Sequence, residues 1–228
     1  GIKQLREAGI EVCIGILEDS IFADFYSYCF HRKFKRPLII VKSASSLDGK
    51  IAAHDNSSKW ISNDRCRHYV QYLRSCSQAI LVGRKTVEID KPRLNVRDFE
   101  VKKQPLRIVI DPKGRIEGIS VQEGEVLIAV GEDASQAKIS AWRDSGIEVV
   151  ILPKKNNGDL CLESLSSHLY EKGIFQLIVE GGSGTYGSFV QQNLIDFWVA
   201  FIAPKLIGNK GNSLVSLPNT TIEEAIDY

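Results

Sequence analysis

Residues 176–192 read QLIVEGGSGTYGSFVQQ. An apolar run with the pattern of a strand ends at Glu180, a glycine-rich turn follows, and a helical pattern begins near Gly184. The strand is apolar on both of its faces, which is typical of a sheet that helices cover on each side. A strand, a tight turn and a helix in this order favour the α/β class.

The same alternation extends outward from this stretch in both directions. LIIV at residues 38–41 and AILV at residues 79–82 are again apolar on both faces, and amphipathic patterns separate such runs. The sequence therefore predicts a three-layer α/β/α sandwich around a largely parallel, mixed sheet. We expect strands over residues 38–44, 79–82, 107–110, 126–130, 148–152, 176–180 and 197–203, and helices over residues 18–31, 63–75, 135–145, 162–172 and 184–193.

The composition is that of a globular protein. The chain has 228 residues, of which 43% are hydrophobic and 25% charged, so it can bury a sizeable core. Its formal net charge of +1 gives no broad basic surface for nucleic acid. The longest nearly uninterrupted apolar stretch, residues 197–203, is far shorter than the roughly 20 residues that span a bilayer. We expect a soluble protein that binds neither nucleic acid nor membrane.

The five cysteines are odd in number and widely scattered, and they lack C-x-x-C spacing. This pattern argues against a disulfide framework and against a zinc site, and it fits a reducing cytoplasm. We therefore expect a cytoplasmic protein without a bound metal. The cysteines are Cys13, Cys29, Cys66, Cys76 and Cys161.

The first 35 residues differ from the rest of the chain. Residues 2–9 predict a helix, and the alternating residues Ile10, Val12 and Ile14 predict a strand after it. A basic segment, HRKFKR, then precedes Pro37. Because the chain lacks Met and begins inside a helical pattern, we expect a piece of a longer polypeptide. The expected parts are the end of a preceding domain (1–20), a linker (21–35) and the main domain (36–228).

The glycine-rich turn after Glu180 has the sequence of an anion site. Glycines let a phosphate approach the backbone, and the N–H groups at a helix N-terminus favour negative charge. Gly182, Gly184 and Gly187 satisfy G-x-G-x-x-G, but only about 40 residues follow, too few for a Rossmann domain built onward from this strand. The alternative is an ordinary strand-to-helix turn. Glu180 at the carboxyl end of a buried strand favours the site, because ligands gather at such strand ends.

A second junction of this kind is ILVGRKTVEID, residues 80–90. Gly83 allows a tight turn, Arg84 and Lys85 suit a phosphate, and Thr86 suits a helix cap. The alternative is a capped helix that carries solvated charges. A dinucleotide needs two phosphate-binding turns on one sheet, whereas a sugar phosphate needs only one.

A third segment, VKSASSLDGKIA at residues 41–52, is followed by SSKWI at residues 57–61. Asp48 and Gly49 form a strong turn signal, so one interpretation is a hairpin with Trp60 in the core. Lys42, however, falls inside an apolar strand, where a buried amine is unfavourable without a partner. That lysine indicates a site.

Seven segments together resemble the reductase domain of the bifunctional riboflavin-biosynthesis deaminase and reductase. They occur in the order of that family between residues 42 and 208, and the combination of SLDG, KWI and DxPxLxVR is specific. Residues 1–20 resemble the last αβ unit of the deaminase half, without its zinc signature H-x-E…P-C-x-x-C. The segments are KSASSLDGKIA, SSKWI, YLRSCSQAILVG, TVEIDKPRLNVR, RIVIDPKGRI, LIVEGGSGTYGSFV and FIAPKLIG.

The resemblance implies a dihydrofolate-reductase-like fold. It also implies NADPH-dependent reduction of the ribosyl group of 5-amino-6-(5-phosphoribosylamino)uracil to its ribityl form, a homodimer, and an N-terminal deaminase domain in the same polypeptide. The residues that would line the NADPH site are Ala44, Trp60, Thr86, Asp90, Gly182, Ser183, Gly184, Thr185, Tyr186, Gly187 and Ser188. Those that would face the substrate are Ser58, Arg74, Leu94, Arg97 and Glu180, with the two arginines near its phosphate.

This chain departs from the family pattern at two places. Family members often carry Ser after the Asp of the RIVID strand, where this chain has Pro112, which has neither a hydroxyl nor an N–H. Arg84 and Lys85 replace smaller residues, and we expect them to bind the 2′-phosphate of NADPH.

For the chemistry, we expect Lys42 and Glu180 to orient the ribose and its developing charge. Asp90 would support the nicotinamide side or relay a proton. Two alternatives remain open at this point, namely a reductase of the same fold that acts on a pterin or dihydrofolate, and a non-catalytic nucleotide-binding domain.

Overall fold

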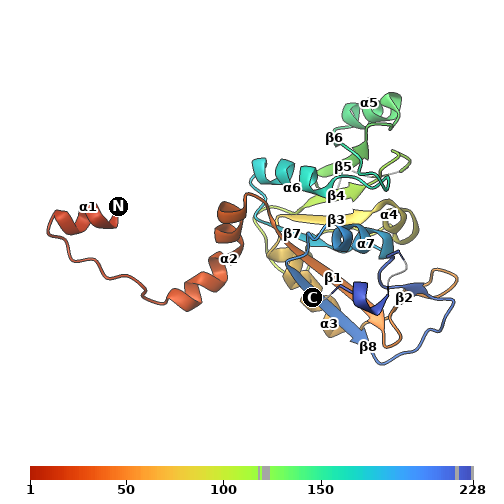
Figure 1. Ribbon diagram of the computed structural model, residues 1–228, viewed down its shortest axis with the longest axis horizontal. Helices are drawn as coiled ribbons and strands as arrows, with labels where there is room; N and C mark the ends of the chain where they lie inside the picture. The colour runs from red at the N-terminus through yellow and green to blue at the C-terminus, as the bar shows by residue number, and fades with distance from the viewer. Residues whose placement is uncertain (118, 120–123, 219–220, 227–228) are drawn as a thin grey trace.

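The computed structural model describes residues 1–117, 119, 124–218 and 221–226. They contain a seven-stranded sheet with the order β6-β5-β4-β3-β7-β1-β8, in which every neighbouring pair is parallel. Figure 1 shows the strands side by side from β6 to β8, with helices on both sides of the sheet. The strands are β1 (Leu38–Ser46), β3 (Ala79–Gly83), β4 (Leu106–Ile110), β5 (Val126–Gly131), β6 (Glu148–Leu152), β7 (Gln176–Val179) and β8 (Phe197–Ala203).

Helices α2 to α7 lie against or beside this sheet, and α1 lies apart from it (Figure 1). They are α1 (Ile2–Glu7), α2 (Glu18–Phe34), α3 (Asp64–Ser75), α4 (Arg84–Asp90), α5 (Gln136–Asp144), α6 (Leu162–Glu171) and α7 (Ser183–Gln191), with a 3-10 helix at Ile222–Glu224.

Alternate side chains of each central strand enter two different cores. In β3, Leu81 packs with residues of α6 and α7, whereas Ile80 and Val82 pack with residues of α3 and α5. All three side chains are fully buried. Apolar side chains on both faces of a strand require a cover on both faces, and this confirms the α/β/α sandwich predicted from the sequence.

The antiparallel pairing lies outside this sheet. Two short strands that the sequence did not predict, β2 (Lys50–Ala52) and β9 (Asn212–Ser213), form a separate two-stranded sheet. The Asp48–Gly49 turn does separate β1 from β2, but Trp60 is 62% exposed. The alternative interpretation, a hairpin with Trp60 in the core, is therefore wrong.

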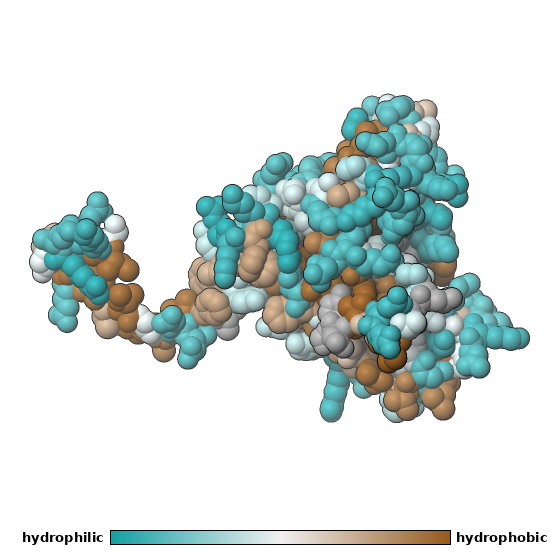
Figure 2. Space-filling model, in the orientation of Figure 1, coloured by the Kyte–Doolittle hydropathy of each residue, from teal (hydrophilic) through white to brown (hydrophobic). Residues whose placement is uncertain are grey.

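The N-terminal segment extends away from the sheet as an arm (Figures 1 and 2). Residues 10–15 form no strand, contrary to the prediction, and the apolar side chains of Ile10 and Ile14 are exposed. A strand needs a partner for its backbone groups, and the described part of the chain offers none beside this segment. The arm meets the sheet through α2, where Phe30 packs against Leu38 and Ile40.

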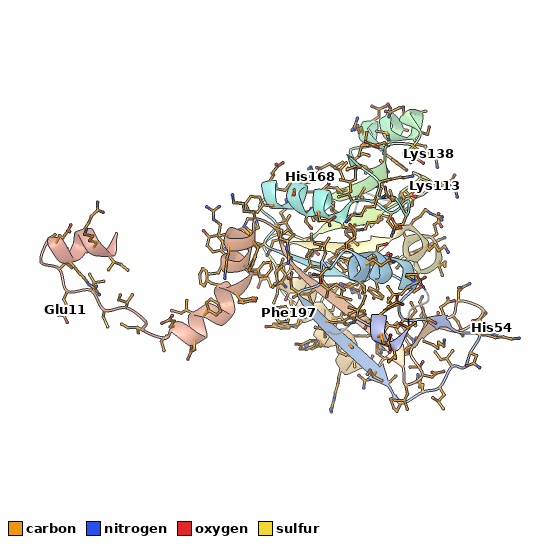
Figure 3. The ribbon with its side chains drawn as sticks, viewed as in Figure 1. Glu11, His54, Lys113, Lys138, His168 and Phe197 are labelled. Carbon is orange, nitrogen blue, oxygen red and sulfur yellow. The ribbon has the colours of Figure 1, made fainter. Side chains whose placement is uncertain are left out.

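The arm and the carboxyl ends of the strands lie at opposite ends of the sheet. The α2 residue His31 contacts Phe175, which comes directly before β7, and the α2 residue Tyr26 contacts Phe197 at the start of β8. Phe197 is labelled in Figure 3. The five cysteines are free thiols. Within the described residues, no helix has the length and apolar character that crossing a membrane would require.

Candidate active site

Two glycine corners meet at the carboxyl ends of β3 and β7, which are neighbours in the sheet. A Cβ added to Gly83 at the end of β3 would lie 2.5 Å from Thr185 Oγ1. A Cβ added to Gly181 after β7 would lie 2.5 Å from Thr185 Cβ. Both positions therefore need glycine, because the Thr185 side chain fills the space between the two corners.

Each corner opens a helix whose N-cap residue is a glycine. The N-cap of α4 is Gly83 and that of α7 is Gly182, and neither has a side chain that could cap the first N–H groups. The sequence suggested Thr86 as the cap of α4, which is wrong, because Thr86 lies inside the helix. The N–H groups of the first turn of a helix have no intrahelical acceptor, so they are available to an anion.

A cleft of about 560 Å³ lies at these corners. The residues of the predicted cofactor and substrate sets that line it come from the two corners and from the segment after β2. They are Ser58, Arg84, Lys85, Thr86, Asp90, Gly182, Ser183, Gly184, Thr185 and Ser188. The departure noted in the sequence, Pro112, lines the same cleft.

Four residues of the predicted cofactor set lie outside the lining of this cleft. Tyr186 is buried and donates a hydrogen bond to the carbonyl oxygen of Lys42 at 2.7 Å, and burial raises the pKa of its hydroxyl. Gly187 faces the backbone of Ser216. Trp60 is exposed, and the Cζ atom of Arg67 lies 4.3 Å from the centroid of its ring. Ala44 lies within β1. A role for these four in cofactor binding stays a prediction.

Arg84 is held at the rim of the cleft by two carboxylates. Its guanidinium donates to Glu88, and its Nε lies 3.7 Å from Asp111 Oδ1. Asp111 is buried and also accepts hydrogen bonds from the backbone of Arg115 and Ile116. Lys85 is exposed beside Arg84. This arrangement orients Arg84 and leaves the ammonium of Lys85 accessible from solvent.

A buried ion pair lies directly behind the corner at Gly181. Arg74 Nε donates to Glu180 Oε1 at 2.6 Å, and Arg74 Nη2 donates to Glu180 Oε2 at 2.9 Å. Arg74 Nη1 also donates to the carbonyl oxygen of Asn95 at 3.1 Å. Burial alone would raise the pKa of Glu180, but the Arg74 charge and hydrogen bonds, with the charge of Lys42, hold it below its usual range. Glu180 is therefore a carboxylate.

The other predicted substrate residues surround this pair unequally. Leu94 is buried and has a φ of 52°, whereas the side chain of Arg97 is exposed. Lys42 is half-buried on β1. Of the predicted substrate residues, Ser58 alone is in the lining of the cleft, and a substrate role for the others stays a prediction.

Asp90 lies in the cleft near the end of α4. Asp90 is exposed overall, but partial burial of its carboxyl against the cleft raises its pKa, while the charge of Lys59 and a hydrogen bond from Ser58 act in the opposite direction. A carboxyl with a raised pKa beside a cleft suits proton transfer.

Sequence reasoning missed Asp159, Leu160 and Leu162 around the start of α6, and it also missed one wall of the cleft. This wall contains Ile51, Ala52, Asn56, Asn212 and Ser216. Asn212 and Ser216 belong to a polar segment far along the chain, and neither apolar periodicity nor a glycine motif marks it. The pairing of β2 with β9 and the hydrogen bond from Ser216 N–H to the Ser183 carbonyl oxygen bring it to the cleft.

Comparison with known proteins gives the family. The sequence from residue 37 to residue 223 matches the family described as the RibD C-terminal domain. The chain belongs to this family. It is 34% identical over 223 residues to the riboflavin biosynthesis protein RibD of Chlamydia muridarum, covering 94% of this chain and 59% of the relative. It is 35% identical over 233 residues to RibD of Aquifex aeolicus, covering 99% of this chain and 62% of the relative.

Solved structures show the same fold as this RibD C-terminal domain. A diaminohydroxyphosphoribosylaminopyrimidine deaminase/5-amino-6-(5-phosphoribosylamino)uracil reductase from Thermotoga maritima has a TM-score of 0.80 and 29% identity, over 99% of this chain and 61% of that one. RibD of Acinetobacter baumannii has a TM-score of 0.83 and 26% identity, over 99% and 62%. The chain thus spans about three fifths of the length of the relatives it matches.

Proposed function

We propose that this RibD C-terminal domain is the NADPH-dependent reductase of riboflavin biosynthesis. Its reaction would convert the ribosyl group of 5-amino-6-(5-phosphoribosylamino)uracil to the ribityl form. The observation that carries the proposal is the pair of glycine corners that share Thr185, because they place two uncapped helix N-termini at one cleft in a chain of this family.

The cleft fits a dinucleotide. Gly184 lines it, and a Cβ added there would meet no atom within 4 Å, so glycine leaves free space at the start of α7. The N–H groups of Ser183, Gly184 and Thr185 would hold the pyrophosphate, since they belong to the first turn of α7. Arg84 and Lys85 would hold the 2′-phosphate with their charged donors. Pro112, which lines the same cleft, has neither a hydroxyl nor an N–H that could take this role.

Bound NADPH would supply a hydride to C1′ of the opened ribosylamine. The protein must orient the sugar and supply a proton for ring opening. Glu180, fixed by Arg74 and kept ionised, would stabilise positive charge at C1′, and it would orient the ribose together with Lys42. Asp90, whose carboxyl has a raised pKa in the cleft, would support the nicotinamide side or relay the proton.

A direct assay tests the function. We expect the purified chain to oxidise NADPH when the phosphoribosylaminouracil is added, with a ribitylamino product identified by mass spectrometry. Oxidation with dihydrofolate or a pterin instead would show a different reductase of the same fold. Stable NADPH binding without oxidation by any of these substrates would show a non-catalytic nucleotide-binding domain.

The proposal extends to partners. The matched relatives are longer than this chain, and the arm carries exposed apolar side chains, including those of Ile16, Phe22 and Phe25. We propose that the arm packs on a deaminase domain of the same polypeptide and that the protein forms a homodimer. Sedimentation of the full-length protein with and without residues 1–35 tests both statements.

A further inference from the structure

Residues 205–216, which we call the strap, contribute two residues to the wall of the cleft that the sequence did not predict. The strap leaves the end of β8 and returns beside β2 (Figure 1). Asn212 and Ser216 of the strap line the cleft together with Ile51 and Ala52 around β2. The shape of this wall therefore depends on what holds the strap in place.

Asp48, in the turn between β1 and β2, holds the beginning of the strap. Its carboxylate accepts hydrogen bonds from the N–H of Gly208 at 2.7 Å and from the N–H of Ile207 at 3.1 Å. Ser46 Oγ donates to the same carboxylate at 2.6 Å. These bonds lower the pKa of Asp48 to about 2, with the Ser46 hydroxyl as the main cause, so the group is a carboxylate at every pH used in an assay.

Two close approaches hold the rest of the strap. A Cβ on Gly211 would lie 2.9 Å from the carbonyl oxygen of Ala52, so glycine lets β9 reach β2. A Cβ on Gly187 of α7 would collide with the carbonyl oxygen of Ser216. The backbone N–H of Ser216 donates to the carbonyl oxygen of Ser183 at 3.1 Å. The strap thus runs from the Asp48 turn, over β2, to the first turn of α7.

We propose that Asp48 is a positioning residue for the nicotinamide nucleotide. It does not line the cleft, but it fixes the strap, and the strap places Ser216 against the start of α7 and Asn212 in the lining of the cleft. Gly187 serves the same purpose, because its lack of a Cβ lets the backbone of Ser216 pack against α7. This inference rests on the proposed function, because it concerns the affinity of the cleft for the cofactor.

Asp48→Asn is the test variant, because it keeps the size of the side chain and replaces one acceptor oxygen with a donor. We expect the dissociation constant for NADPH to rise at least tenfold and the amide hydrogens of Ile207 and Gly208 to exchange faster. We expect kcat at saturating NADPH and the KM for the pyrimidine to stay within threefold of wild type. A side chain that merely supported the fold would lower kcat and both affinities together.

Asp55→Asn is the matched control. Asp55 is a carboxylate in the loop after β2 that accepts hydrogen bonds from Ser57, and it contacts no strap residue through these bonds. The dissociation constant of the Asp55→Asn variant for NADPH should stay within twofold of wild type. If wild type binds NADPH and Asp48→Asn binds it equally well, or if kcat falls with the affinity, the inference about Asp48 is wrong. If wild type itself binds no NADPH, the proposed function fails, and the inference fails with it.

Discussion

Arg74 and Glu180 form a two-point ion pair across 106 residues of sequence, with N–O distances of 2.6 and 2.9 Å. Arg74 lies near the end of α3, and Glu180 directly follows β7. The pair therefore fixes the carboxylate that precedes the glycine corner. A matched guanidinium also keeps the carboxylate ionised in a buried place, where either charge alone would be unfavourable.

Replacing Arg74 with Met should destabilise the protein strongly. The variant leaves the buried carboxylate of Glu180 without its partner, and breaking such a pair costs about 3–5 kcal/mol of the free energy of unfolding. Urea unfolding followed by circular dichroism measures this loss. Arg65→Met on the exposed face of the same helix is the control and should change stability by about 0.5 kcal/mol or less.

The pH dependence of that loss has a definite sign. The pKa of Glu180 is lowered in the folded protein, so its contribution is complete above the ordinary value of 4.5 and is lost as pH falls through the lower folded value. In Arg74→Met, burial without the guanidinium raises the pKa of Glu180, so its carboxyl takes up a proton before pH 4.5 is reached. The stability gap between wild type and Arg74→Met should therefore be widest near pH 7 and should narrow as pH falls. A gap that stays constant from pH 7 to pH 3 would contradict the pairing.

Replacing Gly83 with Ala should displace Thr185. The new Cβ would lie 2.5 Å from Thr185 Oγ1, so we expect lower stability and at least tenfold weaker NADPH binding, measured by calorimetry. Thr185→Ala in the same chain removes the collision and should restore part of the lost stability. Gly184→Ala, with open space around the new Cβ, is the steric control and should raise stability by up to about 1 kcal/mol.

Much of the sheet could be predicted from the sequence, because burial on both faces leaves a plain signature. The strands predicted at residues 148–152 and 197–203 coincide with β6 and β8. A different signal, the alternation of Ile10, Val12 and Ile14, failed, because alternation alone does not supply a partner strand. The strands β2 and β9 were missed because two or three residues are too few for any periodicity to show.

The candidate site was predictable in its parts and not in its arrangement. The glycines marked both corners, since a tight turn before a helix has a sequence signal. Thr185 as the shared contact of Gly83 and Gly181, and Arg74 as the partner of Glu180, depend on the packing of β3 against β7 and of α3 against the sheet. No local pattern records such long-range contacts.

Lys85→Ser should reduce the selectivity for NADPH over NADH. The exposed ammonium is expected to bond the 2′-phosphate, and a charge-assisted hydrogen bond contributes about 1.5–3 kcal/mol, or roughly 10- to 100-fold in affinity. The dissociation constant for NADPH should rise by that factor, and the one for NADH should not change. Equal effects on both nucleotides would place the 2′-phosphate elsewhere. Lys113→Ser is the matched control, because Lys113 follows Pro112 and is exposed outside the cleft lining.

Glu180→Gln should lower turnover while retaining the cofactor. Gln keeps an acceptor for Arg74 but removes the charge that would stabilise a positive C1′, so we expect kcat to fall at least tenfold, about 1.4 kcal/mol in activation free energy. Stopped-flow oxidation of NADPH measures the rate, and the NADPH dissociation constant serves as the control and should stay within threefold. A kcat within threefold of wild type would remove Glu180 from the proposed chemistry.

The central claim is that the two glycine corners, at Gly83 at the end of β3 and at Gly181 after β7, hold one nicotinamide nucleotide between them. A crystal structure of the protein with NADPH tests it most directly. We predict the pyrophosphate against the N–H groups of Ser183, Gly184 and Thr185, with the phosphorylated ribose beside Arg84 and Lys85. A nucleotide bound outside this cleft, or with its pyrophosphate away from the start of α7, would contradict the account.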